Sequence, residues 1–294
     1  FTVDANAPAG ASTNNSLSEL AHVLNACGIN GPVTINIAAN SGPYNGEVIL
    51  ANIAGNDSVN TITINGNGNT IQHLSTNTNQ RATLRVDGVD YLTVNNLTIK
   101  ALGEQAGEFG FAVQLLNNAD FNTFNNVTVE ATVTSTSTNF AAFVTSSSNI
   151  SATTSGAAAS NLTLTNSTII GGYYGVVVNG PTAAPFAEGA NISNNVIRDF
   201  YLYGLYVRGN LNGQFNNNDI HRMNRTTLST FYGIYLNSRL DNSVFNANRI
   251  HDDAATAGTS YSSYPIYGTG AIGSTGNPYR ITNNAIYNIR NTGV

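Results

Sequence analysis

An internal repeat is the feature that most constrains the fold of this chain. Its unit is an apolar residue, any residue, Asn or a small residue, two further residues, and then Ile or Val, as in Val94–Ile99 (VNNLTI). Further copies span 124–129, 164–169, 192–197, 215–220, 245–250 and 281–286, and degenerate copies surround Ile35 and Ile64. The clear copies begin 23 to 40 residues apart. A period of this size, built from short alternating segments, indicates the stacked coils of a β-solenoid.

A second repeat advances together with the first. It reads Tyr-Gly followed by alternating apolar residues, with copies at Tyr174, Tyr203 and Tyr232 and related segments at Phe140 and Tyr264. Alternation of period two predicts strands, and the 3.6-period stretches of a helical repeat are absent. The Asn positions fall where a coil must turn, because Asn tolerates left-handed backbone angles and can stack on the Asn of the next coil. We predict an all-β, right-handed parallel β-helix of about nine coils.

One α-helix is expected, over residues 16–27. Ser16 to Glu19 reads as a capping box, apolar residues follow at helical spacing, and Gly28 ends the segment. An amphipathic helix of this kind would cover the first coil, so Cys27 and His22 are interpreted as part of the cap. We expect a single domain over 1–294, with a cap segment at 1–31 and coils over 32–294. No cap sequence follows the last repeat, so another domain or chain is expected to cover the C-terminal end. We expect residues 1–294 to be the N-terminal part of a longer protein.

Composition narrows the class of partner. Only 9% of residues are charged and the net charge is −5, which disfavours nucleic acid because its phosphates need clustered Lys and Arg. No apolar run approaches the roughly 18 residues needed to cross a bilayer, so membrane insertion is not expected. The chain starts at Phe1 rather than Met, as expected of a mature secreted protein, and its one cysteine excludes an intrachain disulfide.

Several segments resemble a known group. The opening Phe1–Asp4, Gly31–Ile37 and Gly42–Glu47 resemble the N-terminal part of large right-handed β-helix proteins of Bacteroidota. The Asn-Asn-x-Ile and Tyr-Gly-Ile-Tyr-Leu repeats are similar to those of the pectate-lyase-like superfamily. The resemblance implies export to the cell surface, by the type IX secretion route. It implies no single activity, because the group includes lyases, hydrolases and adhesins.

An outward column of aromatic residues is a candidate binding surface. If Ile234 and Leu236 face the core, Tyr235 faces outward. The predicted outward column is Phe143, Val177, Tyr206, Tyr235 and Tyr267. Two residues further along the strands lie Asn179, Arg208, Asn237 and Thr269. Tyr206, Arg208, Tyr235, Asn237 and Tyr267 are therefore predicted to contact sugars by stacking and hydrogen bonding, the alternative being that they pack beneath a long loop such as 252–263. Tyr203, Tyr232 and Tyr264 are assigned to the core.

A second column carries the densest set of titratable side chains. It follows the last Ile of each repeat and contains Lys100, Glu130, Ile170, Arg198, His221, His251 and Tyr287. Beside it run Asp199, Arg222, Asp252 and Asn288. Candidate catalytic residues are Arg198, His221, Arg222, His251 and Asp252, because a lyase needs a cation to neutralise a uronate and a base to remove its proton. The alternative is that these are solvated strand ends.

Three functions follow from these patterns. The preferred hypothesis is a secreted surface module that is adhesive or contacts glycans without catalysis, because no complete catalytic motif is present. The alternatives are a polysaccharide lyase or glycoside hydrolase acting on a cell-wall, algal or plant polysaccharide, and a structural stalk or fibre segment. No residue spacing indicates a metal site, and no cofactor is expected.

Overall fold

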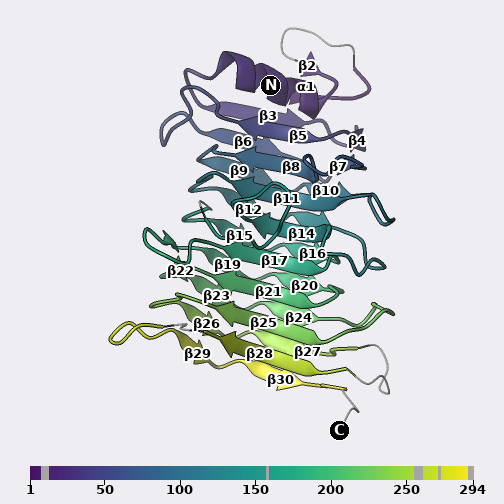
Figure 1. The fold of residues 1–294 in the computed structure, drawn as a ribbon. Helices are drawn as coiled ribbons and strands as arrows, with labels where there is room; N and C mark the ends of the chain where they lie inside the picture. The colour runs from purple at the N-terminus through teal and green to yellow at the C-terminus, as the bar shows by residue number, and fades with distance from the viewer. Residues whose placement is uncertain (8–12, 157–158, 255–260, 271–272, 291–294) are drawn as a thin grey trace.

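The computed structural model describes residues 1–7, 13–156, 159–254, 261–270 and 273–290, and Figure 1 shows them as a stack of coils. Three parallel sheets run along the stack, named here sheets A, B and C. From β3 onward, each coil contributes one strand to each sheet in turn, as the two sequence repeats predict, and the last coil ends after its strands in sheets A and B. The prediction of an all-β parallel β-helix with one helix near its N-terminus is confirmed.

Sheet A carries the strand before each Asn corner. In spatial order its 11 strands are β2 (Thr13–Asn14), β1 (Thr2–Val3), β3 (Val33–Ile37), β6 (Ile62–Asn65), β9 (Leu92–Asn95), β12 (Thr123–Asn125), β15 (Thr163–Thr165), β19 (Asn191–Ser193), β23 (Gln214–Asn216), β26 (Val244–Asn246) and β29 (Arg280–Thr282). A short separate pair, β18 (Ala187–Glu188) and β22 (Asn210–Leu211), lies between sheets C and A along the chain.

Sheet B follows the corner. Its nine strands are β4 (Tyr44–Asn45), β7 (Thr70–His73), β10 (Thr98–Ala101), β13 (Thr128–Glu130), β16 (Thr168–Ile170), β20 (Val196–Arg198), β24 (Asp219–His221), β27 (Arg249–His251) and β30 (Ala285–Tyr287). Sheet C has the longest strands. Its eight strands are β5 (Val48–Ala51), β8 (Ala82–Asp87), β11 (Gly110–Leu116), β14 (Phe140–Thr145), β17 (Tyr174–Asn179), β21 (Tyr203–Arg208), β25 (Phe231–Asn237) and β28 (Ser263–Thr269).

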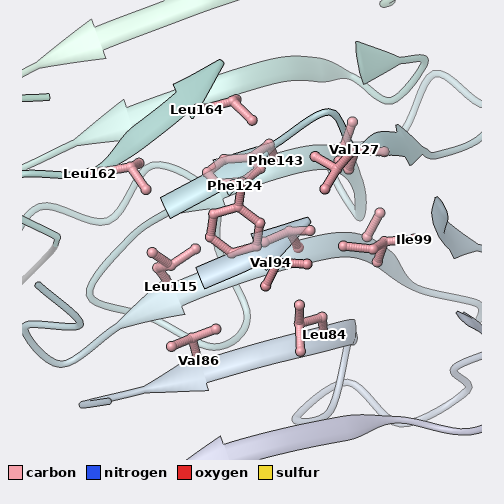
Figure 2. Packing of buried hydrophobic residues seen from close by; sticks show 14 of the residues in the cluster. Leu84, Val86, Val94, Ile99, Leu115, Phe124, Val127, Phe143, Leu162 and Leu164 are labelled. Carbon is pink, nitrogen blue, oxygen red and sulfur yellow. The ribbon is translucent and has the colours of Figure 1, made fainter. Parts of the chain in front are cut away.

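The core fills the space between the three sheets. Figure 2 shows apolar side chains of successive coils packing together, among them Val94, Ile99 and Phe124. Phe143 belongs to this core, where it meets the ring of Phe124 edge-on with centroids 5.1 Å apart. The prediction that Phe143 faces outward is therefore wrong. The register pairs Val144 with Val177, so Val144 holds the outward position.

The Asn corners join sheet A to sheet B in two ways. Asn residues at the turn take left-handed angles, with φ between 49° and 60° at Asn96, Asn126, Asn166, Asn194, Asn217 and Asn283. Inside the corner, Asn195, Asn218 and Asn248 form a buried ladder that continues to the half-buried Asn284. The backbone and side-chain N–H groups of Asn218 both donate to Oδ1 of Asn248 at 3.0 Å, and the same pattern recurs at its neighbours. This confirms the structural role predicted for the repeated Asn.

The two ends of the stack differ. Helix α1 (Leu17–Cys27) lies across the N-terminal end, with Ser16 capping Glu19 N–H at 3.2 Å and Leu17, Leu20 and Leu24 buried. His22 and Cys27 lie on its exposed side. At the other end the core-side residues are open: Ile281 and Ile286 are 41% and 49% exposed, whereas their partners one coil earlier are fully buried. Coverage of this end by another domain or chain stays a prediction.

Among the described residues, no helix has the length and apolar character needed to cross a bilayer.

Candidate functional site

The outer face of sheet C is apolar along much of its length. Strands β11, β14 and β17 are buried at every residue, on the outer face as well as the core face. A second hydrophobic cluster forms on the outside, centred on Ala82, Phe111, Ala141, Val144, Ala152, Tyr174, Val177 and Tyr206. A sheet buried on both faces needs a cover, and Ala152 shows that residues 146–155 provide part of it. This segment is called the cover loop below.

Polar bonds hold the cover loop to sheet C. The Nδ2 of Asn179 donates to the carbonyl of Thr154 at 2.6 Å, and the guanidinium of Arg208 donates to the carbonyl of Thr153. Arg208 also donates to Oδ1 of Asn179 at 2.6 Å. The predicted packing beneath a loop therefore applies to this end of the face, where the loop is 146–155. Within the loop suggested from the sequence, 252–263, residues 255–260 lie outside the described residues.

From the cover loop toward the C-terminal end, the outer face becomes a double row of tyrosines. The register confirms the predicted column Val177, Tyr206, Tyr235 and Tyr267, with Asn179, Arg208, Asn237 and Thr269 two residues on. A second column runs beside it, made of Tyr174, Tyr203, Tyr232 and Tyr264. Together, Tyr174, Tyr203, Tyr206, Tyr232, Tyr235, Tyr264 and Tyr267 are called the tyrosine ladder.

The assignment of Tyr203, Tyr232 and Tyr264 to the core is wrong. Strict alternation would place Tyr203 on the side of Leu205, but Gly204 between them also faces inward. A Cβ at Gly204 would lie 2.9 Å from side-chain atoms of the core residues Ile220 and Phe200. Two consecutive inward residues reverse the alternation, so Tyr203 and Tyr206 both point outward. The repeated Gly after Tyr was the sequence signal for this reversal.

The rings of the ladder pack as a herringbone. Within a column they are nearly parallel, with centroids 5.1 Å apart for Tyr203–Tyr232 and for Tyr206–Tyr235. Between columns they are nearly perpendicular, as for Tyr232 and Tyr235 at 5.3 Å and 85°. Both arrangements are favourable for aromatic pairs. Each inner ring therefore lies between two parallel neighbours, and the surface presents ring edges and phenol hydroxyls rather than open ring faces.

Burial sets the protonation of these phenols. Burial, with the other tyrosines nearby, raises the pKa of Tyr203, Tyr232 and Tyr235, and burial raises the pKa of Tyr174 to about 12. The hydroxyls are therefore neutral donors and acceptors at ordinary pH. Nδ2 of Asn237 donates to the hydroxyl of Tyr206 at 3.4 Å. Exposure increases along the ladder, from 6% at Tyr206 to 40% at Tyr264.

The titratable column lies on sheet B with the predicted register. Lys100 pairs with Glu130, Ile170 with Arg198, and Arg198 with His221. The imidazoles of His221 and His251 stack with centroids 5.2 Å apart, and His251 stacks on Tyr287 at 4.6 Å. The structure therefore brings Arg198, His221 and His251 onto one outer surface.

His251 is held between two carboxylates. Its Nε2 lies 2.6 Å from Oδ1 of Asp219 and its Nδ1 lies 2.7 Å from Oδ2 of Asp252. Arg249 binds Asp219 at 2.6 Å and Arg290 binds Asp252 at 2.9 Å. Burial by itself raises the pKa of Asp252, but the His251 hydrogen bond and the Arg290 charge together lower it. Both ring nitrogens of His251 are thus engaged, which leaves neither free to take a proton from a substrate.

Arg222 lies inside the protein rather than on the outward column. It is fully buried, and its guanidinium donates to the carbonyls of Asp253, Tyr201 and Ser229 at 2.6 to 2.9 Å. Its neighbour Arg225 is buried in the same way and bonds the carbonyls of Thr227, Asp199 and Ser135. Both side chains tie loops of different coils together. Sequence reasoning missed this because the acceptors are backbone groups far away in the chain.

Among the candidate catalytic residues, His221 and Arg198 remain partly exposed. Arg198 forms an ion pair with Asp199 at 2.6 Å. Burial lowers the pKa of His221, and the buried Nδ1 of His221 has no hydrogen-bond partner among the described residues. The result is one neutral imidazole beside a paired cation. Within the described part of the chain, no group of three or more His, Cys, Asp or Glu side chains is placed to hold a metal ion.

Comparison with known proteins agrees with this architecture. Residues 153–294 match the family model described as "Right handed beta helix region". Among solved structures, the Escherichia coli protein YbhC superposes with a TM-score of 0.52 at 13% identity, covering 97% of this chain and 84% of that chain. The pectate lyase Pel9A superposes with a TM-score of 0.50 at 15% identity, covering 100% and 78%. No curated protein matches the sequence. At these identities the likeness shows a shared fold.

Proposed function

We propose that this protein is a non-catalytic β-helix module that contacts glycans through the tyrosine ladder, at a bacterial cell surface. The observation that carries the proposal is the herringbone packing, which turns a row of neutral phenol hydroxyls and ring edges to solvent. Hydroxyl groups that both donate and accept are suited to the hydroxyls of sugars. A fold shared with a pectate lyase fits this class of ligand.

The repeat of the ladder favours a chain over a single sugar. Tyr206, Tyr235 and Tyr267 are register partners on adjacent strands, and adjacent strands lie about 4.8 Å apart. An extended glycan that crosses the strands meets the same set of groups at each coil. Several weak contacts then act together, which raises the affinity of a polymer above that of its monomer.

The proposal also places the module outside the cell. The resemblance of the opening segments to surface proteins of Bacteroidota implies secretion by the type IX route. The whole chain carries a net charge of −5, so contact with a glycan through the ladder would depend on hydrogen bonds and ring contacts rather than on long-range attraction.

A lyase or hydrolase is the second candidate, and it depends on His221. Burial lowers the pKa of the half-buried His221, and this is the one observation that favours it, because a neutral imidazole is the form that accepts a proton. Turnover of uronate polymers, followed by the ultraviolet absorbance of unsaturated products and by new reducing ends, tests it directly. Activity that disappears in His221→Ala would replace the proposal of a non-catalytic module.

A hydroxyl-deletion series tests the proposed glycan contact. The full chain is screened on immobilised polysaccharides, and the best ligand is titrated against Tyr232→Phe, Tyr235→Phe and Tyr267→Phe. Each change keeps the ring and removes one hydroxyl, so we expect about a fivefold loss of affinity for each. Tyr91→Phe is the matched control, because Tyr91 stacks on Phe121 away from the ladder. Unchanged affinity in all three ladder variants would contradict the proposal.

A further inference from the structure

A separate cavity lies where the cover loop meets the first ring of the tyrosine ladder. Its volume is about 250 Å³. The walls come from the start of sheet C, from the loop before β14 and from the cover loop. The polar residues that line it are Arg81, Thr138, Asn139, Ser151, Thr153 and Tyr174.

Arg81 is the one charged side chain in this lining. It is 8% exposed, and its guanidinium lies 4.3 Å from the ring centroid of Phe109. Nε donates to the carbonyl of Thr78, Nη2 to Oγ1 of Thr78, and Nη1 to Oδ1 of Asn139, each at 2.9 Å. A guanidinium has five N–H donors, so among the described residues one N–H on each terminal nitrogen remains without a partner.

The charge of Arg81 is not balanced by a carboxylate. Among the described residues, no Asp or Glu forms an ion pair with it, whereas Arg198, Arg239 and Arg249 each bind an Asp within 2.6 Å. Burying an unpaired cation is costly, and an anion that enters the cavity removes part of that cost. Arg222 is also buried without an ion pair, but it does not line this cavity and its nitrogens all bond to carbonyls.

The other polar groups of the cavity are hydroxyls and an amide. Ser151 accepts from the backbone of Thr153 through Oγ, which leaves its own hydroxyl proton free to donate. Thr138 and Tyr174 add hydroxyls to the lining. A cation surrounded by hydroxyl donors, with no carboxylate in the walls, is complementary to an oxyanion.

We infer that the Arg81 cavity is an anion site that takes the carboxylate of an acidic sugar or a sugar sulfate ester. The inference rests on the proposed function in one respect, namely that the anion is carried by a glycan lying on the tyrosine ladder. Tyr174 connects the two sites, because it lines the cavity and is the first ring of the column that continues through Tyr203, with centroids 5.3 Å apart. The Arg81 cavity would therefore select glycans that carry a charged residue at one position.

Three sugars with the same ring test this site in the full chain. Glucuronate, glucose 6-sulfate and glucose are titrated by calorimetry at constant ionic strength. We expect one or both anions to bind and glucose to bind at least about tenfold more weakly, because a charge-assisted bond to Arg is lost. The stronger of the two anions identifies the group that the cavity takes.

Two variants locate the binding. Arg81→Lys keeps the charge but loses the planar fork, and we expect about a tenfold loss of anion affinity. Thr138→Phe fills the cavity from an exposed position and leaves Arg81 untouched, so it tests the site even if Arg81→Lys does not fold. Anion binding that is equal in the wild type and in Thr138→Phe, or no stronger than that of glucose, overturns the inference.

The same titrations separate this site from the tyrosine ladder. In Tyr232→Phe/Tyr235→Phe, we expect monosaccharide anion affinity to stay at the wild-type value. Anion binding that persists while no polysaccharide binds the ladder would support the Arg81 cavity and contradict the proposed function. Polysaccharide binding that depends on the ladder, but not on Arg81 or on the charge of the glycan, would support the proposed function and contradict the Arg81 cavity as an anion site.

Discussion

The outer face of sheet C has a covered end and an open end, and the same strand positions hold different residues in each. Val144 and Val177 lie in the covered end, Tyr206 is still buried at its margin, and Tyr235 and Tyr267 continue the same column into the open end. Valine has no polar group, so it can be buried completely. Tyrosine has a hydroxyl that needs a partner or solvent. Residue type along the column therefore follows the presence of the cover and marks where the face is free for a ligand.

The largest expected effect comes from placing a charge in the covered end. Val144 is fully buried, so Val144→Asp should lower the free energy of unfolding by roughly 4 kcal/mol. Tyr235→Asp, in the same column but half-buried, should cost about 1 kcal/mol. Urea unfolding of both variants measures the difference. Equal losses would show that the two ends are not distinct environments.

The second-largest effect is expected from alkaline pH, which should lower the free energy of unfolding through the tyrosine ladder. The pKa of Tyr174 is raised by burial from 10.0 to about 12, so the folded state favours the neutral phenol. Its contribution to stability is fully present below pH 10 and is lost as the pH rises toward about 12, by an amount on the order of 2 kcal/mol. Urea unfolding midpoints measured across this range should fall less in Tyr174→Phe than in the wild type. An identical fall would remove Tyr174 as the cause.

Releasing the cover loop should have a smaller effect. Arg208 holds the loop by donating to the carbonyl of Thr153 and to Asn179. Arg208→Met keeps the aliphatic stem and removes these bonds, so it should cost about 1 to 2 kcal/mol. Hydrogen exchange should rise in residues 146–155 and stay unchanged in β25. Arg249→Met, whose ion pair with Asp219 is on the exposed part of sheet B, is the control.

The smallest expected effect is at the last ring. Tyr264 is 40% exposed, so Tyr264→Ser should change the free energy of unfolding by less than about 1 kcal/mol. We nevertheless expect it to reduce polysaccharide affinity, since the open end is the proposed contact surface. A loss of stability comparable to that of Val144→Asp would show that the ladder is structural along its whole length.

The fold could be predicted from the sequence because each coil repeats the same short pattern of residues. The apolar alternation and the Asn corners specify strands and turns without reference to distant residues, and the register of Tyr206, Tyr235 and Tyr267 follows from them. The alternation rule failed for Tyr232, because Gly233 also faces the core and a Cβ there would meet Ile250 at 2.6 Å. A local pattern with one such exception per coil misplaces a whole column.

The candidate sites were less predictable because they depend on contacts between coils. Arg222 was expected beside the outward column, yet its partners are carbonyls of Tyr201, Ser229 and Asp253. His251 was a candidate base, and only the structure places Asp219 and Asp252 on its two nitrogens. The hydrogen-bond partners of these long side chains come from neighbouring coils, so the spacing of residues in the sequence does not specify those partners.

The herringbone packing of the tyrosine rings also gives the protein an intrinsic spectroscopic signal. The chain has no tryptophan, and seven of its 14 tyrosines form the ladder. Aromatic transitions held about 5 Å apart at fixed angles couple as excitons, and their handed arrangement gives the aromatic band a circular dichroism signal that isolated phenols lack. A ligand that shifts the angle between rings changes this signal without any label. The proposed contact surface therefore also reports its own occupancy, through the near-ultraviolet circular dichroism of its tyrosines.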